Sequence, residues 1–238
     1  MSRTIVVLPT YDEAENLPRI VPAILAQTPE IEILVVDDHS PDGTGKIADQ
    51  LAEETGRVHV LHREGKAGLG AAYRAGLARA LELGADRVIQ MDADFSHPPD
   101  QIPVLLRELE SHDAVLGSRY LKGITVVNWP IERILLSYFG NLYARRATGL
   151  HISDMTGGFR AVRRELLERI GFERIKADGY AFQIEMNFRL VQTDARIAEI
   201  PFFFLDRTHG ESKLSWKIGL EALWIVWWLR LAKALGRL

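Results

Sequence analysis

The sequence predicts an α/β protein in which helices flank a mostly parallel, doubly wound sheet. The main observation is that short apolar runs alternate with helical segments from Thr4 to Ser118. The chain has 238 residues, which suits one large domain with a substantial core. Hydrophobic residues make up 47% and charged residues 26%, the composition of an ordinary globular protein.

The expected strands are short and rich in Val, Ile and Leu. In chain order they are Thr4–Leu8, Ile31–Asp37, Val58–His62, Asp86–Asp92 and Ala114–Ser118. Helices are expected between them at about Glu13–Gln27, Asp42–Thr55, Gly68–Leu83 and Pro98–Leu109. Beyond about residue 120 the alternation weakens. There we expect helices at about 131–148, 163–170 and 180–193 that cover one side of the sheet, then the apolar strand Ile200–Leu205.

The composition excludes several classes of protein. The chain has no Cys, which excludes disulfides and Cys-based zinc sites. Its net charge of −3 gives no case for nucleic acid as a partner. The longest purely apolar stretch, Ala222–Leu229, is far shorter than the roughly 20 residues that span a bilayer. The first residues enter a strand without a signal-peptide pattern, which predicts a cytoplasmic protein.

Acidic residues follow three of the expected strands, in the segments Pro9–Glu13, Val36–Ser40 and Asp92–Asp94. In doubly wound sheets ligands bind at the carboxyl ends of strands, so these carboxylates are expected at one edge. A divalent cation would relieve their repulsion, and Mg²⁺ or Mn²⁺ prefers such oxygen ligands together with phosphate oxygens. The alternative is that each Asp caps the helix after it. Three clusters on one edge favour a site for metal and diphosphate.

Seven segments carry a resemblance to a known family: PTYDE, VVDDHSPDGT, GLGAAYRAG, MDADFSHPP, GSRY, DMTGGFR and DRTHGESKL. Together they resemble the polyprenol-phosphate (dolichol-phosphate) mannose synthases, which are inverting family 2 glycosyltransferases with the GT-A fold. The resemblance covers about residues 3–217. It implies transfer of mannose from GDP-mannose to a polyprenyl phosphate, with Mg²⁺ or Mn²⁺ as cofactor. DADFSHPP, DMTGGFR and DRTHGESKL are the narrower motifs and point to the lipid phosphate.

The resemblance also implies roles for individual residues. The donor nucleotide is expected to contact Pro9, Tyr11, Glu13, Val36, Asp38, Asp92, Ala93 and Asp94. Tyr11 would stack on the base and Glu13 would accept from its amino edge. Asp94 is the first choice for direct metal contact, with Asp92 beside it. The family often has Gln where this chain has Ser96, so Ser96 or a water is expected as a further metal ligand.

Cations are needed because the donor diphosphate and the acceptor phosphate bring several negative charges together. The resemblance assigns this task to Arg119, Arg133, Arg207 and Lys213, and places Asp92, Asp94, Arg119 and Arg133 in the catalytic set. Lys176 and Asp178 are assigned to the acceptor region on less specific spacing. For any one of these cations the alternative is a solvated surface charge.

The predicted reaction needs little acid–base machinery. A phosphate monoester is already a dianionic nucleophile at neutral pH, so no general base has to activate it. His97 is therefore interpreted as a turn residue, and His39 and His209 as polar loop residues or phosphate contacts. Gly68 and Gly70 indicate close helix packing rather than a dinucleotide fingerprint. Gly157 and Gly158 indicate either backbone approach to the donor sugar or a tight turn.

The C-terminal segment is expected to be a helix from about Ser215. It holds four of the five Trp residues, and residues 212–238 carry five basic side chains against one acidic, a net +4. This composition is typical of a headgroup interface. We expect a catalytic domain at 1–214 and a segment at 215–238 that binds the cytoplasmic membrane face or a separate membrane subunit. The alternative is a helix packed on its own domain with Trp in the core.

Three other functions stay open at this stage. The same chemistry could use another sugar nucleotide such as UDP-glucose, because the motifs do not separate guanine from uracil. A doubly wound dehydrogenase is a second alternative, but the chain lacks the dinucleotide-binding fingerprint. A non-catalytic module that binds lipid phosphate or nucleotide is the third, and it would not need Asp92 and Asp94.

Overall fold

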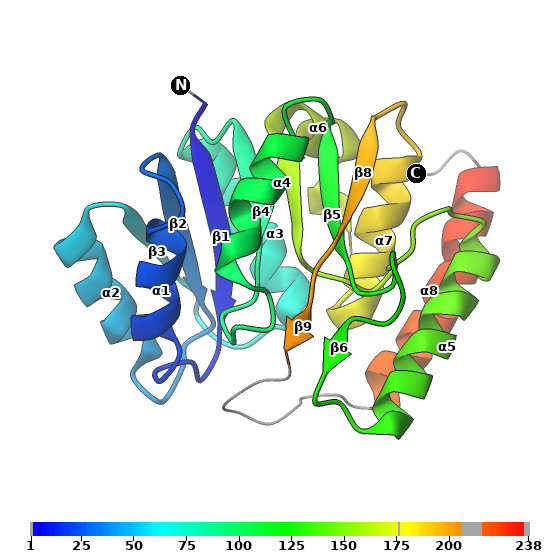
Figure 1. Ribbon diagram of the computed structural model, residues 1–238, viewed down its shortest axis with the longest axis horizontal. Coiled ribbons are helices and arrows are strands. Elements are labelled where there is room, and N and C mark those ends of the chain that lie inside the picture. The colour runs from blue at the N-terminus through cyan, green and yellow to red at the C-terminus, as the bar shows by residue number, and fades with distance from the viewer. Residues whose placement is uncertain (1, 176, 206–215, 236–238) are drawn as a thin grey trace.

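A seven-stranded sheet forms the centre of the protein (Figure 1). The computed structural model describes residues 2–175, 177–205 and 216–235. The strands of the sheet are β1 Thr4–Thr10, β2 Ile31–Asp37, β3 Val58–His62, β4 Arg87–Gln90, β5 Ala114–Ser118, β7 Arg160–Arg163 and β8 Ile197–Pro201. They are ordered β3-β2-β1-β4-β7-β5-β8, and all pair in parallel except β7, which is antiparallel to β4 and β5. β6 Val126–Val127 and β9 Phe204–Leu205 form a small separate parallel pair.

Helices cover both faces of the sheet, which explains why its strands are apolar throughout. One face packs against α1 Leu17–Leu25, α2 Thr44–Thr55 and α4 Ile102–Glu108, the last preceded by the 3-10 turn η1 Pro99–Gln101. The other face packs against α3 Leu69–Glu82, α5 Ile131–Thr148, α6 Arg164–Ile170, α7 Gly179–Val191 and α8 Trp216–Ala234, with the turn η2 Phe172–Arg174. The expected helices beyond residue 120 therefore lie on one side, as predicted.

The C-terminal helix α8 lies beside α5 and packs against α7 (Figure 1). Ile225, Val226 and Leu229 are buried and belong to the same core cluster as the α3 face of the sheet. The predicted tail helix is confirmed from Trp216 to Ala234. Among the described residues, none of the helices combines the length and apolar character that a membrane crossing requires.

The element ends agree with prediction for β2, β3, β5 and α5, whereas others differ. β1 continues to Thr10 rather than ending at Leu8. β4 ends at Gln90, so Asp92 and Asp94 lie in the following loop rather than in the strand. α1 begins at Leu17 because residues 13–16 form a turn in which the Glu13 carbonyl accepts from the Asn16 and Leu17 amides. The expected strand at 200–205 is divided, since β8 ends at Pro201 and β9 begins at Phe204.

The antiparallel strand β7 was not predicted. Its sequence is Arg160-Ala161-Val162-Arg163, so only the two central residues carry the apolar signal of a buried strand. Arg160 is nevertheless fully buried, because β7 lies between β4 and β5 in the middle of the sheet. β7 separates β3, β2, β1 and β4 from β5 and β8.

Candidate active site

Three neighbouring strands bring the predicted acidic segments to one edge of the sheet. β1 lies between β2 and β4, and the chain leaves this point in opposite directions to build the two halves of the sheet. This switch point is where ligands bind in open α/β sheets. The loops after the three strands each contain a non-glycine residue in the left-handed conformation: Asp12 at φ 60°, His39 at φ 58° and Phe95 at φ 62°. Such residues cost about 1–3 kcal/mol each and cluster at functional sites.

Side chains after β2 hold the loop after β1 in place. Three backbone N–H groups of the first loop donate to side-chain oxygens of the second: Asp12 to Ser40 Oγ (3.1 Å), Glu13 to Thr44 Oγ1 (2.9 Å) and Ala14 to Asp42 Oδ2 (3.0 Å). The sequence predicted acidic residues and a helix start in this segment, but not that its side chains hold the neighbouring loop. The fixed loop presents Tyr11 and Glu13 at the switch point.

The residues predicted for the donor nucleotide are brought together, but with partners that were not predicted. The Lys66 ammonium lies 3.7 Å from the centre of the Tyr11 ring. The Asp38 carboxylate is buried and forms an ion pair with Arg63, Oδ1 to Nη1 at 2.5 Å. Both cations follow β3. Pro9 and Val36 are register partners on β1 and β2.

Val36 and Ala93 can meet a nucleotide only through their backbone. Both side chains are buried, at 0% and 3% exposure. Gly76 of α3 lies so close to Val36 that a β-carbon at Gly76 would be 2.8 Å from Val36 Cγ2. The prediction that these two residues line the nucleotide therefore concerns their main chain.

The acidic pair Asp92 and Asp94 lies in the loop that follows β4, the strand next to β1. Asp92 Oδ1 accepts a hydrogen bond from the Tyr73 hydroxyl at 2.9 Å, and its side chain is 30% exposed. Asp94 is buried, and its Oδ1 accepts from the Ser96 amide at 3.1 Å. Burial raises the pKa of Tyr73 well above 10, so Tyr73 stays a hydrogen-bond donor at neutral pH.

These residues fit a divalent cation. The Ser96 hydroxyl is buried, and no hydrogen-bond partner is found for it within the described ranges. In the part of the chain that the structure describes, no three His, Asp or Glu side chains come together to hold a metal, so carboxylates alone would not complete the coordination of an ion. Two carboxylates and one hydroxyl leave several coordination positions for diphosphate oxygens and water, which is how Mg²⁺ is commonly bound. Asp92, Asp94 and Ser96 would hold the ion.

His97 supports the acidic loop and does not act as a base here. Its Nδ1 accepts the Asp92 backbone N–H at 3.0 Å, and its ring stacks on Phe159 with centroids 5.0 Å apart. Burial lowers the pKa of His97, so the ring is neutral at physiological pH. The interpretation of His97 as a turn residue agrees with this geometry.

Arg119 is held by Asp154 of the DMTGGFR segment. Arg119 Nε and Nη2 donate to Oδ2 and Oδ1 of Asp154 at 2.6 and 2.8 Å, and Nη2 also donates to Thr156 Oγ1 at 2.8 Å. Both partners of the ion pair are buried. Burial alone would raise the pKa of Asp154, but the Arg119 charge and the hydrogen bonds from Arg119 and Thr156 together outweigh it, and the pKa is lowered. Arg119 therefore anchors a loop, a role that the sequence did not indicate.

The other residues predicted for phosphate or acceptor binding are Arg133, Arg207, Lys213, Lys176 and Asp178. Arg133 lies in the first turn of α5 with its guanidinium carbon 3.9 Å from the centre of the Trp129 ring. Arg207, Lys213 and Lys176 lie outside the described residues. Asp178 Oδ1 accepts the Gly70 amide at the N-terminus of α3, and a β-carbon at Gly70 would lie 2.6 Å from the Ala177 carbonyl. The Gly68–Gly70 pair is thus a close helix contact, as predicted.

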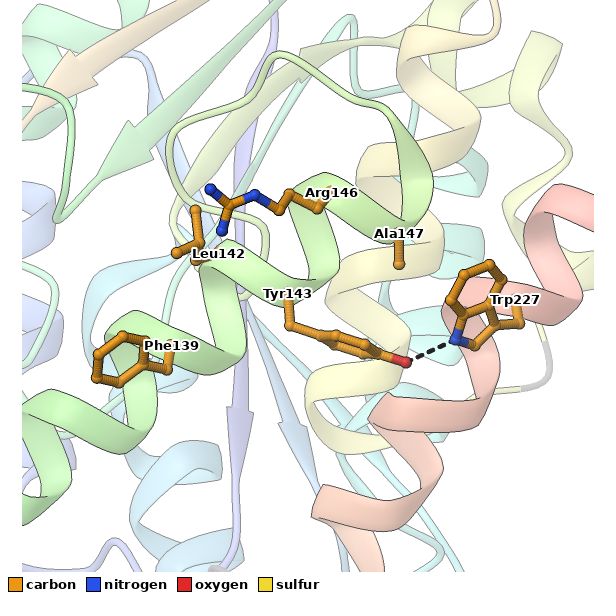
Figure 2. A pocket seen from close by; sticks show the side chains of 6 residues that line it. All are labelled: Phe139, Leu142, Tyr143, Arg146, Ala147 and Trp227. Carbon is orange, nitrogen blue, oxygen red and sulfur yellow. Dashed lines mark hydrogen bonds between the residues drawn. The ribbon is translucent and has the colours of Figure 1, made fainter.

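A groove lies between α8 and α5, the helix that carries Arg133; Figure 2 shows the residues that line it. It has a volume of about 360 Å³ and is lined by Phe139, Leu142, Tyr143, Arg146, Ala147 and Trp227. Trp227 Nε1 donates to the Tyr143 hydroxyl at 2.7 Å across the groove, as Figure 2 shows.

Large apolar side chains continue from the groove over both helices. On α5 the exposed ones are Ile131, Leu135, Leu136, Tyr138 and Phe139. On α8 they are Trp224, Trp227, Trp228 and Leu231, and Leu235 directly follows the helix. The α8 set recurs at helical spacing, which makes one exposed apolar stripe opposite the buried one. We call these ten residues the apolar face. The core alternative for the tail is thus only half right, because the helix packs on the domain while Trp224 stays 67% exposed.

Comparison with known proteins places these features in a family. The family model "Glycosyl transferase family 2" matches residues 5–171. The chain is 46% identical over 232 residues to a polyprenol monophosphomannose synthase of Mycolicibacterium smegmatis, covering 96% of this chain and 88% of that protein. It is 46% identical over 221 residues to an undecaprenyl-phosphate mannosyltransferase of Micrococcus luteus, covering 93% and 91%.

Solved structures share the fold at low sequence identity. A glucosyl-3-phosphoglycerate synthase from Mycobacterium tuberculosis, in complex with Mn²⁺, UDP and its product, matches with TM-score 0.64 and 22% identity over 99% of this chain and 80% of that one. A mannosyltransferase from Pyrobaculum calidifontis in complex with GDP-Man and Mn²⁺ matches with TM-score 0.59 and 20% identity over 99% and 76%. The expected GT-A fold is confirmed.

Proposed function

The chain belongs to glycosyl transferase family 2, and on that basis we propose that it transfers mannose from a sugar nucleotide to a polyprenyl phosphate. The observation that carries the proposal is the 46% identity, over nearly the whole chain, to two relatives named for this chemistry. The donor we propose is GDP-mannose, as the resemblance to mannose synthases implies. UDP-glucose is the alternative donor.

The edge of the sheet at β1, β2 and β4 is the proposed donor site. Tyr11, Glu13 and Asp38 would contact the nucleoside, with the backbone of Pro9, Val36 and Ala93 completing the wall. Asp92, Asp94 and Ser96 would hold Mg²⁺ or Mn²⁺ beside the diphosphate. Bound there, the ion would stabilise negative charge on the departing diphosphate.

The proposed reaction is a single displacement. An oxygen of the lipid phosphate attacks the anomeric carbon of mannose and forms the new C–O bond. The bond between that carbon and the diphosphate breaks, and its electron pair leaves with GDP, so the configuration inverts. The attacking phosphate carries no proton that must be removed, since its second pKa is about 6.

The contacts of the nearby titratable groups suit this mechanism. Both carboxylate oxygens of Asp154 accept hydrogen bonds from Arg119. His97 uses Nδ1 to accept from the Asp92 amide. Neither group is arranged to take a proton from an acceptor, and a phosphate nucleophile needs no such group.

Cations would position the acceptor phosphate. We retain Arg133, Arg207 and Lys213 for this task, with Lys176 and Asp178 as weaker candidates. Arg119 remains in the proposed catalytic set, but its bidentate bond to Asp154 indicates that it also fixes the loop on which the acceptor would rest.

We further propose that the apolar face meets the membrane surface that holds the acceptor. Contiguous exposed apolar side chains of this extent mark an interaction site on a water-soluble surface. Arg145, Arg146, Arg230 and Lys233 lie on the same two helices, and such residues attract anionic headgroups. We keep the proposed division of function, in which residues 1–214 carry out catalysis and residues 215–238 form the interface segment. Binding at the cytoplasmic face, or through a separate membrane subunit, stays a prediction.

Turnover of radiolabelled sugar nucleotides tests the proposal. The purified chain is incubated with a short polyprenyl phosphate and either GDP-mannose or UDP-glucose, with and without Mg²⁺. We expect a lipid-linked product from GDP-mannose only, and only with the metal. Product from UDP-glucose and not from GDP-mannose would show that UDP-glucose is the donor. No product from either sugar nucleotide would refute the assignment.

A further inference from the structure

Among the described residues, Arg160 comes first by volume among the fully buried side chains, and no ion pair is found for its charge there. Its Nη2 donates to the Gly157 carbonyl at 2.6 Å and to Gln183 Oε1. Its Nε and Nη1 have no hydrogen-bond partner, and no carboxylate within the described ranges lies within 4.0 Å of it. Gln90, its register partner on β4, likewise has no partner for either side-chain amide atom among the residues that the structure describes.

A buried charge in this state needs an explanation. Removing a cation from water costs several kcal/mol unless another charge compensates. Burial lowers the pKa of Arg160 to about 10, against the opposing effect of the negative charges of Asp154 and Asp92. Arg160 is therefore still positive at neutral pH. Buried water between Arg160 and Gln90 could satisfy the open donors, but it would not supply a counter-charge.

The negative groups within electrostatic reach belong to the active site. Two relationships place Arg160 near the acidic pair. Its register partner Gln90 lies two residues before Asp92, whose carboxylate accepts from the buried Tyr73 hydroxyl. The Tyr73 ring stacks on Phe182 of α7, the residue before Gln183, which accepts from Arg160. The bond from Arg160 to Gly157 also fixes the Gly157–Gly158 turn. A β-carbon at Gly158 would lie 3.0 Å from Gln183 Nε2 and 3.7 Å from His97. Arg160 thus lies behind both the acidic loop and the glycine turn.

We propose that Arg160 is a positioning residue for the diphosphate of the donor: its fixed positive charge behind Asp92 favours binding of the diphosphate at this edge of the sheet. The inference rests on the proposed donor site. It explains why a full charge is kept in the core, since the compensating negative charge would arrive with the substrate. A preorganised charge of this kind needs no rearrangement when the leaving group becomes more negative.

The experiment compares nucleotide binding by the unmodified chain, Arg160→Met and Arg160→Lys. Met is close in volume but neutral, and Lys keeps the charge. Titration calorimetry measures binding of GDP and of guanosine, each with and without Mn²⁺. We expect Arg160→Met to weaken GDP binding at least about ten-fold, the effect of one unit charge about 12 Å away at an effective dielectric constant near 20. Guanosine binding should be unchanged, and Arg160→Lys should restore most of the loss.

Two results would overturn the inference. Equal losses for GDP and guanosine would show that Arg160 only maintains the fold, and unchanged GDP binding would remove any role. If Arg160→Met does not fold, Arg160→Gln takes its place, because Gln is neutral but keeps a donor for the Gly157 carbonyl, and the inference requires it to lose GDP binding and not guanosine binding. Failure of the unmodified chain to bind GDP or UDP would instead refute the proposed function.

Discussion

Arg119 and Asp154 form a bidentate ion pair in the interior, with Nε to Oδ2 at 2.6 Å and Nη2 to Oδ1 at 2.8 Å. The Arg119 backbone N–H also donates to Asp154 Oδ2, at 3.1 Å. The pair joins the end of β5 to the loop before β7, two segments that flank the proposed acceptor side of the active site. Both side chains are almost inaccessible to water, so this contact decides how the loop is held.

Replacing Asp154 by Asn should strongly destabilise the fold, because Arg119 would be left as a buried charge without its partner. Removal of one member of a buried pair typically costs about 3–5 kcal/mol. Urea unfolding of Asp154→Asn measures it. Asp113→Asn is the control, since the Asp113–Arg196 pair is largely exposed and such pairs contribute at most about 1 kcal/mol. A loss from Asp154→Asn no larger than the control would contradict the structural role of the pair.

The same pair gives a pH dependence whose sign is fixed. The pKa of Asp154 is lower in the folded state than its ordinary 3.8. The stabilisation is therefore complete above the unfolded-state pKa and is lost as the pH falls through the folded-state pKa. The stability difference between the unmodified chain and Asp154→Asn should shrink as the pH is lowered below about 3.8. A difference that grows on acidification would contradict the assigned direction.

Replacing Asp94 by Ala should lower turnover by several orders of magnitude and leave the fold intact. The change removes a carboxylate ligand from a site where the ion stabilises the leaving group. Mn²⁺ binding, followed by electron paramagnetic resonance, should fall together with activity, and circular dichroism should be unchanged. Ser96→Ala is the graded comparison, expected to weaken Mn²⁺ binding by roughly 10- to 100-fold if the hydroxyl helps to hold the ion. Full activity in excess EDTA would contradict the metal assignment.

Arg133→Met, Arg207→Ala and Lys213→Ala should impair handling of the acceptor phosphate more than stability. Loss of a hydrogen bond to a charged group typically costs about 1.5–3 kcal/mol, or roughly ten- to a hundred-fold in KM or kcat/KM for the lipid phosphate. Thermal unfolding provides the comparison for stability. If all three variants show kinetics close to those of the unmodified chain, these residues are solvated surface charges and do not bind the acceptor phosphate.

Removing exposed apolar side chains from α8 should abolish binding to anionic liposomes without unfolding the domain. Truncation at residue 214 is not a suitable test, because Ile225, Val226 and Leu229 belong to the core. The double variant Trp224→Ser, Leu231→Ser changes only exposed positions. Leu69→Ser, an exposed apolar change outside the apolar face, is the control. Co-sedimentation of the double variant at the level of the control would contradict the membrane role of α8.

The sequence predicted the edge of the sheet that forms the candidate site because strand ends and acidic motifs are local features. Asp38, Asp92 and Asp94 each follow a strand whose apolar run is plain in the sequence, and the doubly wound order brings those strands together. What could not be predicted depends on pairing over long separations. Arg119 and Asp154 are 35 positions apart, and nothing in either motif indicates that the two side chains meet.

Strand β7 and Arg160 were missed for a related reason. A four-residue strand with Arg at both ends has no apolar periodicity, and its burial is imposed by its neighbours β4 and β5. The tail illustrates the opposite case. Its composition indicated an interface helix or a core helix, and the structure gives α8 both a buried stripe and an exposed apolar stripe.

The most direct test of the account compares two acceptors that differ only in the phosphate. The purified chain is given GDP-mannose and Mg²⁺ with either a polyprenyl phosphate or the corresponding polyprenol, and formation of mannosylated lipid is followed by mass spectrometry. The account predicts product from the phosphate, with inverted anomeric configuration, and none from the alcohol, because a hydroxyl needs a general base whereas the phosphate dianion attacks without one. Equal product from both lipids would contradict the direct attack by phosphate on which the proposed mechanism depends.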